Sequence, residues 1–441
     1  MKKGKFFIQT FGCQMNDHDS EAMAGIMRGA GYDEAARPAD ADVILVNTCA
    51  IREKAEQKAY SQIGRYKQLK AKRPGMVIGV GGCMAQSAGE GVLSRVPYVD
   101  FVFGTQAMHR ILEMVDEVKE KRRQPVWIGM GEDPSTMEKL YAHSSSQDGL
   151  KAFVTVMQGC DNYCAYCIVP YVRGRELSRP SEDIVSEVRR HVAGGVREVT
   201  LLGQNVNSYG LKGGDGADFS ELIRKVSEVE GLKRIRFTTS HPKDLTDELI
   251  SLFNSVDKVM PHIHLPLQSG SNAILAAMNR RYTVERYLSL IDKLRGEVPE
   301  IAITSDVIVG FPGEGEEEFR ATLDVMERVR FDGLFSFKFS PREGTRAAKM
   351  EDALPEEVKE ARLAILQDLQ REHTLERNEL WVGRVRPTLV EGSSKSGGGQ
   401  LMGRTPENKI VNFHGDKSLI GEVVEVRVTR GGINSMVGEL A

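Results

Sequence analysis

Residues 156–170 read VMQGCDNYCAYCIVP and hold three of the six cysteines of this 441-residue chain. Cys160, Cys164 and Cys167 follow one another with the spacing C-x3-C-x2-C. A structural zinc site is normally closed by four protein ligands, often supplied as two pairs. This segment offers three thiols, and Asp161 is not spaced as a fourth partner. The segment therefore predicts a metal centre with one position left open.

Three thiolates also suit an iron–sulfur cluster. A 4Fe–4S cluster held by three cysteines leaves one iron without a protein ligand, and S-adenosylmethionine (SAM) can chelate that iron through its amino and carboxylate groups. An electron passed to the sulfonium then cleaves a C–S bond and releases a 5′-deoxyadenosyl radical. We interpret the missing fourth cysteine as the position that such a cofactor needs. A zinc site or a chance cluster of cysteines is the alternative.

Three apolar runs near the N-terminus, FFIQTFGC, DVILVNTC and MVIGVGGC, each end in a cysteine: Cys13, Cys49 and Cys83. Helical patterns at about 17–28 and 52–70 separate them, and this alternation predicts a parallel sheet with right-handed crossovers. Ligands gather at the carboxyl ends of such strands. One such cysteine could be a small buried hydrophobe. Three at matching places predict a second three-cysteine cluster whose open iron could carry sulfur.

The rest of the chain divides into a linker and two further parts. A polar stretch at 131–149 reads as a linker. Six segments beyond it have strand character and are mostly separated by helical patterns, which predicts an incomplete βα barrel with its chemistry at the carboxyl ends of the strands: AFVTVMQG, EVTLLGQ, RIRFTTS, HIHLPLQS, IAITSDVIVG and GLFSFKFS. A long charged helix at about 355–380 leads to short strands and Gly-rich turns from Trp381 onward, which predict a small β-barrel.

The composition is that of an ordinary soluble globular protein, with 41% hydrophobic and 27% charged residues and a formal net charge of -3. The N-terminal run is too short and too broken, by Gln9 and Gly12, for a signal peptide. No run approaches the roughly 18 apolar residues of a membrane span. We therefore expect a cytoplasmic protein without membrane contact, in which cysteines serve metal binding or catalysis more often than disulfides.

Several longer motifs resemble those of the radical SAM methylthiotransferase family over essentially the whole chain. They are QTFGCQMN, VNTCAIREKAEQK, GVGGCMAQ, QGCDNYCAYCIVPYVRGRELSRP, LLGQNVNSYG, HLPLQSGS and FSPREGTRA. The resemblance implies an α/β chain of three domains. These are an N-terminal parallel βα methylthiotransferase domain at 1–145, a partial (βα)6 radical SAM barrel at 146–377, and a small antiparallel β-barrel, the TRAM domain, at 378–441.

The resemblance also implies the reaction. AIREKAEQK, after Cys49, favours the branch that acts on tRNA carrying isopentenyladenosine at position 37 and adds a methylthio group to carbon 2 of the adenine. One SAM would supply the methyl group and a second the radical. Cys160, Cys164 and Cys167 would hold the SAM-binding 4Fe–4S cluster, and Cys13, Cys49 and Cys83 an auxiliary, sulfur-carrying one. The implied partners are the tRNA anticodon stem-loop and an electron donor such as flavodoxin or ferredoxin. We expect a monomer.

Further cofactor contacts are implied at the strand ends of the barrel. Gly203 and Gln204 end the second strand, Gln268 and Ser269 end the fourth, and Tyr166 lies where the superfamily places a residue near the SAM adenine. Turn geometry, helix capping and simple packing are the alternatives for these positions. Gly315 stands where the family usually has threonine, which puts any hydroxyl role at that turn in doubt.

The segment PYVRGRELSRP is rich in arginine and follows the clustered cysteines. We expect Arg173, Arg175 and Arg179 to contact phosphate or substrate, since unpaired RNA bases stack on aromatic or Arg planes. A solvated charged face is the alternative. No acid–base catalyst emerges from the sequence. Other functions that stay open are methylthiolation of threonylcarbamoyladenosine or of a ribosomal-protein aspartate, and a non-enzymatic zinc protein that binds RNA.

Overall fold

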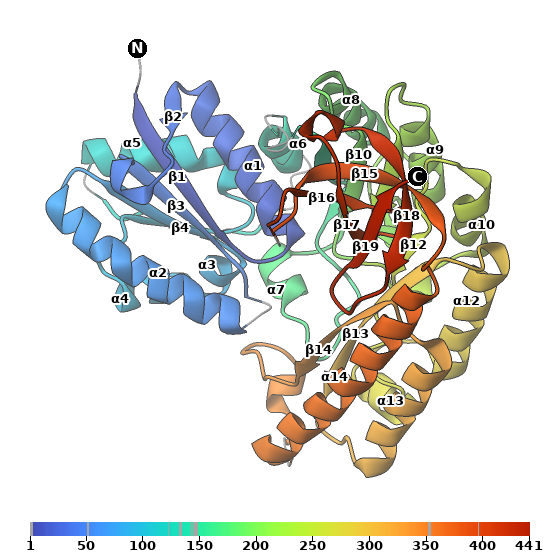
Figure 1. Ribbon diagram of the computed structural model, residues 1–441. Coiled ribbons are helices and arrows are strands. Elements are labelled where there is room, and N and C mark those ends of the chain that lie inside the picture. The colour runs from blue at the N-terminus through green and yellow to red at the C-terminus, as the bar shows by residue number, and fades with distance from the viewer. Residues whose placement is uncertain are drawn as a thin grey trace.

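The computed structural model describes residues 3–50, 53–121, 123–131, 135–142, 144, 149–351, 354–395 and 397–441. Residues 51 and 52 of the AIREKAEQK motif, and part of the predicted linker at 131–149, lie outside the described residues. The three parts of the chain are seen side by side in Figure 1, with the N-terminal sheet on the left and the C-terminal barrel in red.

The N-terminal part is a six-stranded parallel sheet with the strand order β2-β1-β3-β4-β5-β6. Its strands are β1 (Gly4–Phe11), β2 (Tyr32–Glu34), β3 (Val43–Thr48), β4 (Val77–Gly82), β5 (Phe101–Phe103) and β6 (Val126–Trp127). Helices α1 (Gln14–Gly29) and α5 (Ile111–Lys121) cover one face, and α2 (Glu53–Lys72), α3 (Cys83–Ala88) and α4 (Gly91–Arg95) cover the other. The predicted parallel βα domain is confirmed.

The stretch predicted as a linker contains a helix, α6 (Ser135–Tyr141). Met137, Leu140 and Tyr141 are buried and join the core formed by α1 and α5. These three residues lie three and four apart and so share one face of the helix. The polar composition of the surrounding sequence concealed this short apolar stripe.

The central part is a partial barrel of six strands. They are β7 (Lys151–Thr155), β10 (Glu198–Leu202), β11 (Arg234–Phe237), β12 (His262–His264), β13 (Ala302–Val309) and β14 (Gly333–Lys338). Two parallel sheets, ordered β11-β10-β7 and β12-β13-β14, meet through a bridge between Ile235 and Val259. All six predicted strands are confirmed. The outer helices are α8 (Ser181–Ala193), α9 (Phe219–Ser227), α10 (Asp247–Ser255), α11 (Asn272–Ala277), α12 (Val284–Glu297), α13 (Glu316–Val329) and α14 (Glu356–Glu379).

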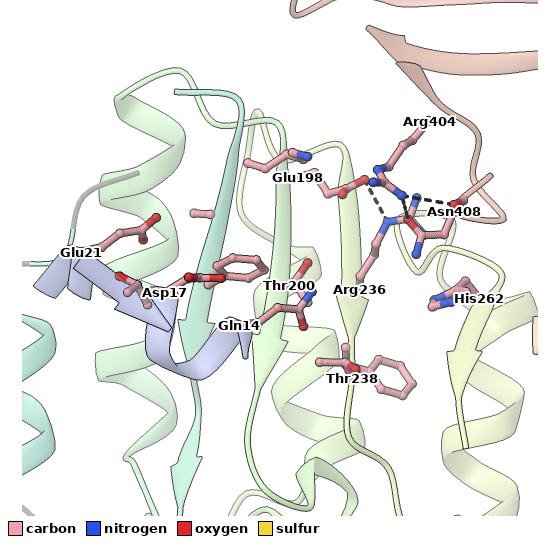
Figure 2. A pocket seen from close by; sticks show the side chains of 15 residues that line it. Gln14, Asp17, Glu21, Glu198, Thr200, Arg236, Thr238, His262, Arg404 and Asn408 are labelled. Carbon is pink, nitrogen blue, oxygen red and sulfur yellow. Dashed lines mark hydrogen bonds and ion pairs between the residues drawn. The ribbon is translucent and has the colours of Figure 1, made fainter. Parts of the chain in front are cut away.

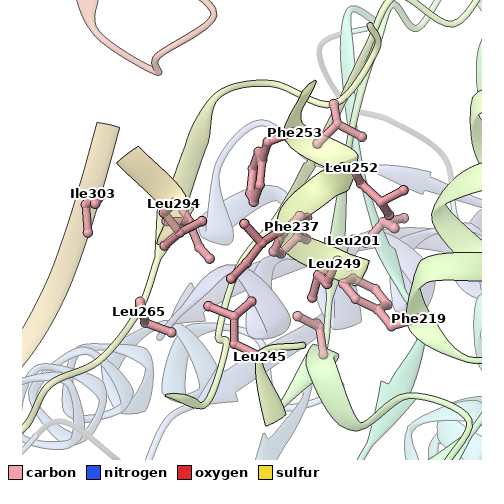
Figure 3. Close-up of a cluster of buried hydrophobic side chains, with 14 of the residues drawn as sticks. Leu201, Phe219, Phe237, Leu245, Leu249, Leu252, Phe253, Leu265, Leu294 and Ile303 are labelled. Atoms are coloured by element: carbon pink, nitrogen blue, oxygen red, sulfur yellow. The ribbon is translucent and has the colours of Figure 1, made fainter. Parts of the chain in front are cut away.

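Alternation along the strands separates an apolar outer face from a polar lumen. Val199 and Leu201 of β10 point into the large core beneath the helices, and Figure 3 shows Leu201 there with Phe219 and Phe237. Thr200, between them, lines a cavity in the lumen. Each large apolar side chain buried in the core contributes about 1.5–3 kcal/mol relative to exposure. The outer face therefore stabilises the barrel and leaves the lumen free for polar groups.

The C-terminal part is a small closed barrel with the strand order β15-β16-β17-β19-β18. Its strands are β15 (Val385–Ser393), β16 (Gln400–Arg404), β17 (Ile410–His414), β18 (Val423–Arg430) and β19 (Met436–Leu440). Its pairs are antiparallel except β17 with β19. The predicted small β-barrel is confirmed.

Two buried arginines fasten the C-terminal barrel to the amino ends of the central strands. Arg234 of β11 donates to the Arg404 and Pro387 carbonyls at 2.8 and 2.9 Å. Arg236 donates to the Pro406 and Thr405 carbonyls at 2.9 and 3.0 Å. The carboxyl ends of the strands, where chemistry is expected in such barrels, lie away from this junction. Among the described residues, no helix is both long and apolar enough to cross a membrane.

Candidate active site

The first group of thiols lies in a loop beyond the carboxyl end of β7. Gly159 precedes Cys160 with a φ of +80°, and a Cβ there would lie 1.9 Å from the Arg175 carbonyl oxygen. The Cys160 amide donates to the Gly174 carbonyl at 3.2 Å, and the Cys167 amide donates to the Cys164 carbonyl at 2.9 Å. Only glycine fits this close approach of two backbones. The loop is thereby folded tightly around its three cysteines.

The second group of thiols lies at one edge of the N-terminal sheet. Strands β1, β3 and β4 are neighbours, and Thr48 pairs with both Phe11 and Gly82. Cys49 and Cys83 follow their strands directly, and Cys13 is the residue before α1. Because neighbouring strands lie about 4.8 Å apart, three residues at matching strand ends are brought close together. The sheet edge that the sequence predicts for the three thiols is the one observed.

The chemistry of both groups fits a cluster ligand set. All six cysteines are free thiols. Burial is the main cause that raises the pKa of Cys83 to about 11; Arg173 partly opposes it, and the neighbouring Cys49 and Cys13 contribute to the increase. Burial likewise raises the pKa of Cys160 to about 11, with Cys164 adding to the effect. In both cases, neighbouring thiols of the same group contribute to the raised pKa. Binding of a cluster would require the thiols to lose their protons.

Among the described residues, no group of three or more Cys, His, Asp or Glu side chains is arranged to hold a single metal ion. A cluster of several irons takes its thiolates farther apart than one ion does, and each cysteine group provides thiol ligands of the kind that such clusters use. The donor sets at Cys13, Cys49 and Cys83 and at Cys160, Cys164 and Cys167 thus fit iron–sulfur clusters.

A short helix, α7 (Val169–Arg173), brings the two thiol groups together. It begins two residues after Cys167 and packs against α3, which begins at Cys83. The Cys83 side chain joins a small buried cluster with Ile168 and Val172. The segment that carries the last cysteine of one group is therefore in contact with a cysteine of the other.

Buried ion pairs fix this arrangement. Arg173, 4% exposed, lies 2.7 Å from the Asp19 carboxylate on α1, and the Tyr141 hydroxyl donates to the same carboxylate at 2.8 Å. Arg179, also 4% exposed, lies 2.7 Å from the Glu187 carboxylate on α8. Of the three arginines predicted to contact substrate, these two are thus engaged within the protein.

Arg175, the third of these arginines, is exposed. It lines a cavity of about 350 Å³ together with Lys212, Gln106, Gln158 and Glu176. Burial raises the pKa of the Glu176 carboxyl to about 7, and Asp161 adds to this shift. The cavity is therefore lined by three cations, since Arg173 also reaches it, and by the carboxyls of Asp161 and Glu176.

Unpaired polar atoms gather at the carboxyl ends of the barrel strands. Gln204 accepts a hydrogen bond from the Gly159 amide, but its own Nε2 has no partner among the described residues. Gln268 has a φ of +70°, is 6% exposed, and its Oε1 is also without a partner there. Buried polar groups normally find partners, and such backbone strain is common at ligand sites. Both observations fit a polar cofactor at this edge.

The other predicted cofactor contacts lie at the same edge. Gly203 directly follows β10, and both it and Ser269 are buried. The fourth strand, β12, ends at His264, earlier than predicted, and Gln268 beyond it forms only an isolated bridge with Val307. Tyr166 is half-buried and packs against the cluster formed by Ala165, Met278 and their neighbours.

The sequence interpretation missed several polar residues at this edge. Side-chain atoms of Asn205, Asn207, Ser240 and His241 are buried and have no partner among the described residues. LLGQNVNSYG, quoted for its family resemblance, contains the first two. The other two follow the third strand in the sequence TTSHP, and their position after a predicted strand was the signal that could have indicated them.

The lumen holds a cavity of about 530 Å³ to which all three parts of the chain contribute (Figure 2). Gln14, next to Cys13, lines it from the start of α1, and Arg404 and Asn408 line it from the C-terminal barrel. Its barrel lining includes Lys151, Phe153, Glu198, Thr200, Arg236, Phe237, Thr238 and His262. Pockets of this size accept small organic groups, and the partly exposed Phe153 ring offers a stacking surface.

Comparison with known proteins agrees with this geometry. Residues 5–104 match the uncharacterized protein family UPF0004, 154–326 the Radical SAM superfamily, and 379–440 the TRAM domain. The chain is 51% identical over 434 residues to a tRNA-2-methylthio-N(6)-dimethylallyladenosine synthase of Geotalea uraniireducens (strain Rf4), covering 98% of each chain. It is 50% identical over 440 residues to the synthase of the same name from Syntrophus aciditrophicus (strain SB), covering 100% of this chain and 95% of that one. The chain belongs to the tRNA-2-methylthio-N(6)-dimethylallyladenosine synthase family.

Solved structures show that the fold of this synthase family member is shared more widely. The radical S-adenosylmethionine methyltransferase TsrM from Kitasatospora setae, with tryptophan and a SAM analogue bound, aligns with a TM-score of 0.55 and 13% identity. The alignment covers 75% of this chain and 72% of that one. At this identity the likeness concerns the fold alone. The family assignment itself confirms a radical SAM enzyme that uses SAM and iron–sulfur chemistry.

Proposed function

We propose that this protein methylthiolates carbon 2 of N6-dimethylallyladenosine at position 37 of tRNA. The observation that carries the proposal is the full-length identity of about 50% to several synthases named for this product, in a chain that has both thiol groups. The other substrates considered for this chemistry find no comparable support. A zinc-only RNA-binding protein is at odds with the Radical SAM match.

Cys160, Cys164 and Cys167 would hold the SAM-binding cluster, and Cys13, Cys49 and Cys83 the auxiliary one. Bound there, SAM and the two 4Fe–4S clusters would supply the 5′-deoxyadenosyl radical and the methylthio group. Gln204 and Gln268 would bind the polar groups of SAM through the side-chain atoms that lack protein partners. Gly203, Ser269 and Tyr166 would shape the surrounding walls.

The polar lumen would receive the substrate base. A base that is stacked between its neighbours in the RNA cannot reach the reacting groups inside an active site. Enzymes that modify bases therefore turn the target nucleotide out of the stack and into a pocket. Phe153 can stack on the base, while Thr200 and Thr238 offer hydroxyls. Closure of the lumen by α1 and the C-terminal barrel would exclude water, which protects a radical reaction from side reactions.

The surroundings of the site suggest how tRNA and electrons arrive. Arg175 and Lys212 are exposed cations that would contact the phosphates of the anticodon stem-loop, and Arg173 and Arg179 would support this loop from beneath through their buried ion pairs. We further propose that a flavodoxin or ferredoxin supplies electrons, and that the protein works as a monomer in the cytoplasm.

An anaerobic assay tests the proposal. The protein, reconstituted with iron and sulfide, is incubated with SAM, a reductant and tRNA bearing N6-dimethylallyladenosine, and the digested nucleosides are weighed by mass spectrometry. We expect a 2-methylthio product together with 5′-deoxyadenosine. Formation of 5′-deoxyadenosine without the product would show that the substrate is wrong.

Removing one cysteine group at a time separates the two proposed clusters. Replacing Cys13, Cys49 and Cys83 by alanine should halve the iron content, abolish the methylthio product and leave 5′-deoxyadenosine formation intact. Replacing Cys160, Cys164 and Cys167 should also halve the iron but abolish both products. Equal iron content in either triple variant and the unaltered protein would refute the assignment of that cysteine group.

A further inference from the structure

Six arginines are buried among the residues that the structure describes, and one of them differs from the rest. Five form ion pairs with carboxylates: Arg173 with Asp19, Arg179 with Glu187, Arg234 and Arg236 with Glu198, and Arg362 with Glu314. The sixth, Arg280, is 4% exposed. Among the described residues, no carboxylate forms an ion pair with it. A buried charge is costly unless an opposite charge compensates it.

The contacts of Arg280 point to the thiol that provides the compensation. Its Nη1 donates to the Cys164 Sγ at 3.4 Å, its Nη2 to the Pro266 carbonyl at 3.2 Å, and its Nε to the Tyr282 hydroxyl at 3.2 Å. The Tyr282 ring also faces the guanidinium, 5.2 Å from its centre. A carbonyl and a phenol are neutral at ordinary pH. Of these groups, only the Cys164 sulfur becomes negative when it ligates iron.

The backbone around Arg280 holds the same cysteine loop. The Ala165 amide donates to the Met278 carbonyl at 2.9 Å. The Asn279 side chain donates to the Asn162 and Tyr163 carbonyls at 3.1 and 3.0 Å. Asn279 and Arg281 both have positive φ, 60° and 57°. Strained backbone of this kind persists only where surrounding contacts hold it in place. On either side of Arg280, the contacts with the cysteine loop do so.

We propose that Arg280 is a positioning residue that directs its guanidinium at the Cys164 sulfur and stabilises the reduced state of the cluster at Cys160, Cys164 and Cys167. Reduction adds a negative charge to a cluster, and cluster potentials respond to net charge and to hydrogen bonds on the sulfurs. A fixed cation with an N–H bond to a ligating sulfur raises the reduction potential. This inference rests on the proposed function, because it requires a cluster at these cysteines.

The variants Arg280→Met and Arg280→Lys test the inference in the full-length, reconstituted protein. The reduction potential is measured by titration followed by electron paramagnetic resonance, using the cluster signal that changes when SAM is added. Arg280→Met should lower the reduction potential by at least about 59 mV, which corresponds to a tenfold change in the one-electron reduction equilibrium. Arg280→Lys keeps the positive charge but lacks the planar set of N–H donors of a guanidinium. Its reduction potential should therefore lie between those of Arg280→Met and the unaltered protein. Arg281→Met is the matched control, since Arg281 is an exposed neighbour, and should leave the potential unchanged.

Each outcome decides the question. Wild-type potentials in the Met and Lys variants would overturn the inference, as would an equal shift in Arg281→Met. If Arg280→Met does not retain its cluster, Arg280→Lys carries the test alone: a lowered potential supports the inference and an unchanged one overturns it. If the unaltered protein has no SAM-sensitive cluster signal, the proposed function itself is refuted, and the inference with it.

Discussion

Arg236→Met should loosen the junction between the central and C-terminal barrels. The guanidinium is 5% exposed, donates to two carbonyls of the β16–β17 loop, and lies 3.1 Å from the Glu198 carboxylate. Methionine fills much of the same volume but leaves those acceptors without their donor. Removing one partner of a buried ion pair costs about 3–5 kcal/mol. Because Arg234 stays 3.8 Å from the same carboxylate, we expect the lower value, about 3 kcal/mol.

Hydrogen exchange followed by mass spectrometry measures this effect where it occurs. A loss of about 3 kcal/mol corresponds to an increase of roughly a hundredfold in the exchange rate of amides that the junction protects, since 1.4 kcal/mol is tenfold. The Lys409 amide, bonded to the Thr405 hydroxyl oxygen in this loop, is a suitable reporter. Peptides of the N-terminal sheet serve as an internal reference, because the change should be confined to the junction.

Arg384→Met is the matched control at the same junction. Arg384 pairs with Glu300 across it, but the two side chains are 47% and 44% exposed. Exposed pairs contribute at most about 1 kcal/mol, so exchange should rise by roughly fivefold or less. Equal exchange in Arg236→Met and Arg384→Met would refute the argument that burial makes the difference. A uniform rise over the whole chain would refute the localisation of the effect.

Other predictions concern single residues. Burial alone raises the pKa of Asp332, but Lys409 and Arg377 more than offset it and hold the pKa below 3.8. The stability contributed by this carboxylate is therefore present above about pH 3.8 and lost below it, so Asp332→Asn should melt lower than the unaltered protein at pH 7 and differ less at pH 3. Gly82 has a φ of +93°, and a Cβ there would lie 2.4 Å from the Thr48 carbonyl oxygen. Gly82→Ala should halve the iron content while 5′-deoxyadenosine still forms; Gly75→Ala, with open space around it, should keep all the iron. Glu187→Gln leaves Arg179 buried without its carboxylate and should lower the free energy of unfolding by about 3 kcal/mol in urea titration, whereas unchanged unfolding would contradict the importance of this pair.

The cysteine edge of the N-terminal sheet could be predicted because simple rules determine it. Apolar runs alternating with helices indicate parallel strands, and parallel strands end on one side. Placing Cys13, Cys49 and Cys83 close together required no knowledge of side-chain packing. The helix α6 could not be predicted in this way, since a helix of seven residues depends on the core it packs against rather than on its own sequence.

The polar cofactor edge was only partly predictable. Gln204 and Gln268 could be expected at this edge because each follows an apolar run, and their role as cofactor contacts stays a prediction. Arg280 could not be expected there, because it lies on the turn after α11 and approaches Cys164 only through the curvature of the barrel. Nothing near residue 280 in the sequence distinguishes it from its neighbour Arg281, which is exposed. The difference between the two is a property of the folded chain.

The arginines of PYVRGRELSRP show why charge alone is a poor guide to exposure. A run of arginines is typical of a solvated or RNA-binding loop, yet Arg173 and Arg179 are buried because their carboxylate partners come from other elements. Asp19 lies on the helix that begins after Cys13, and Arg173 ends the helix that follows Cys167. The ion pair between them therefore connects the elements that carry the two thiol groups. Breaking such a pair costs several kcal/mol, so the separation of the two groups is fixed by packed, charged contacts. The proposed reaction would pass a group from one thiol site to a substrate activated at the other, and it needs a fixed separation of this kind.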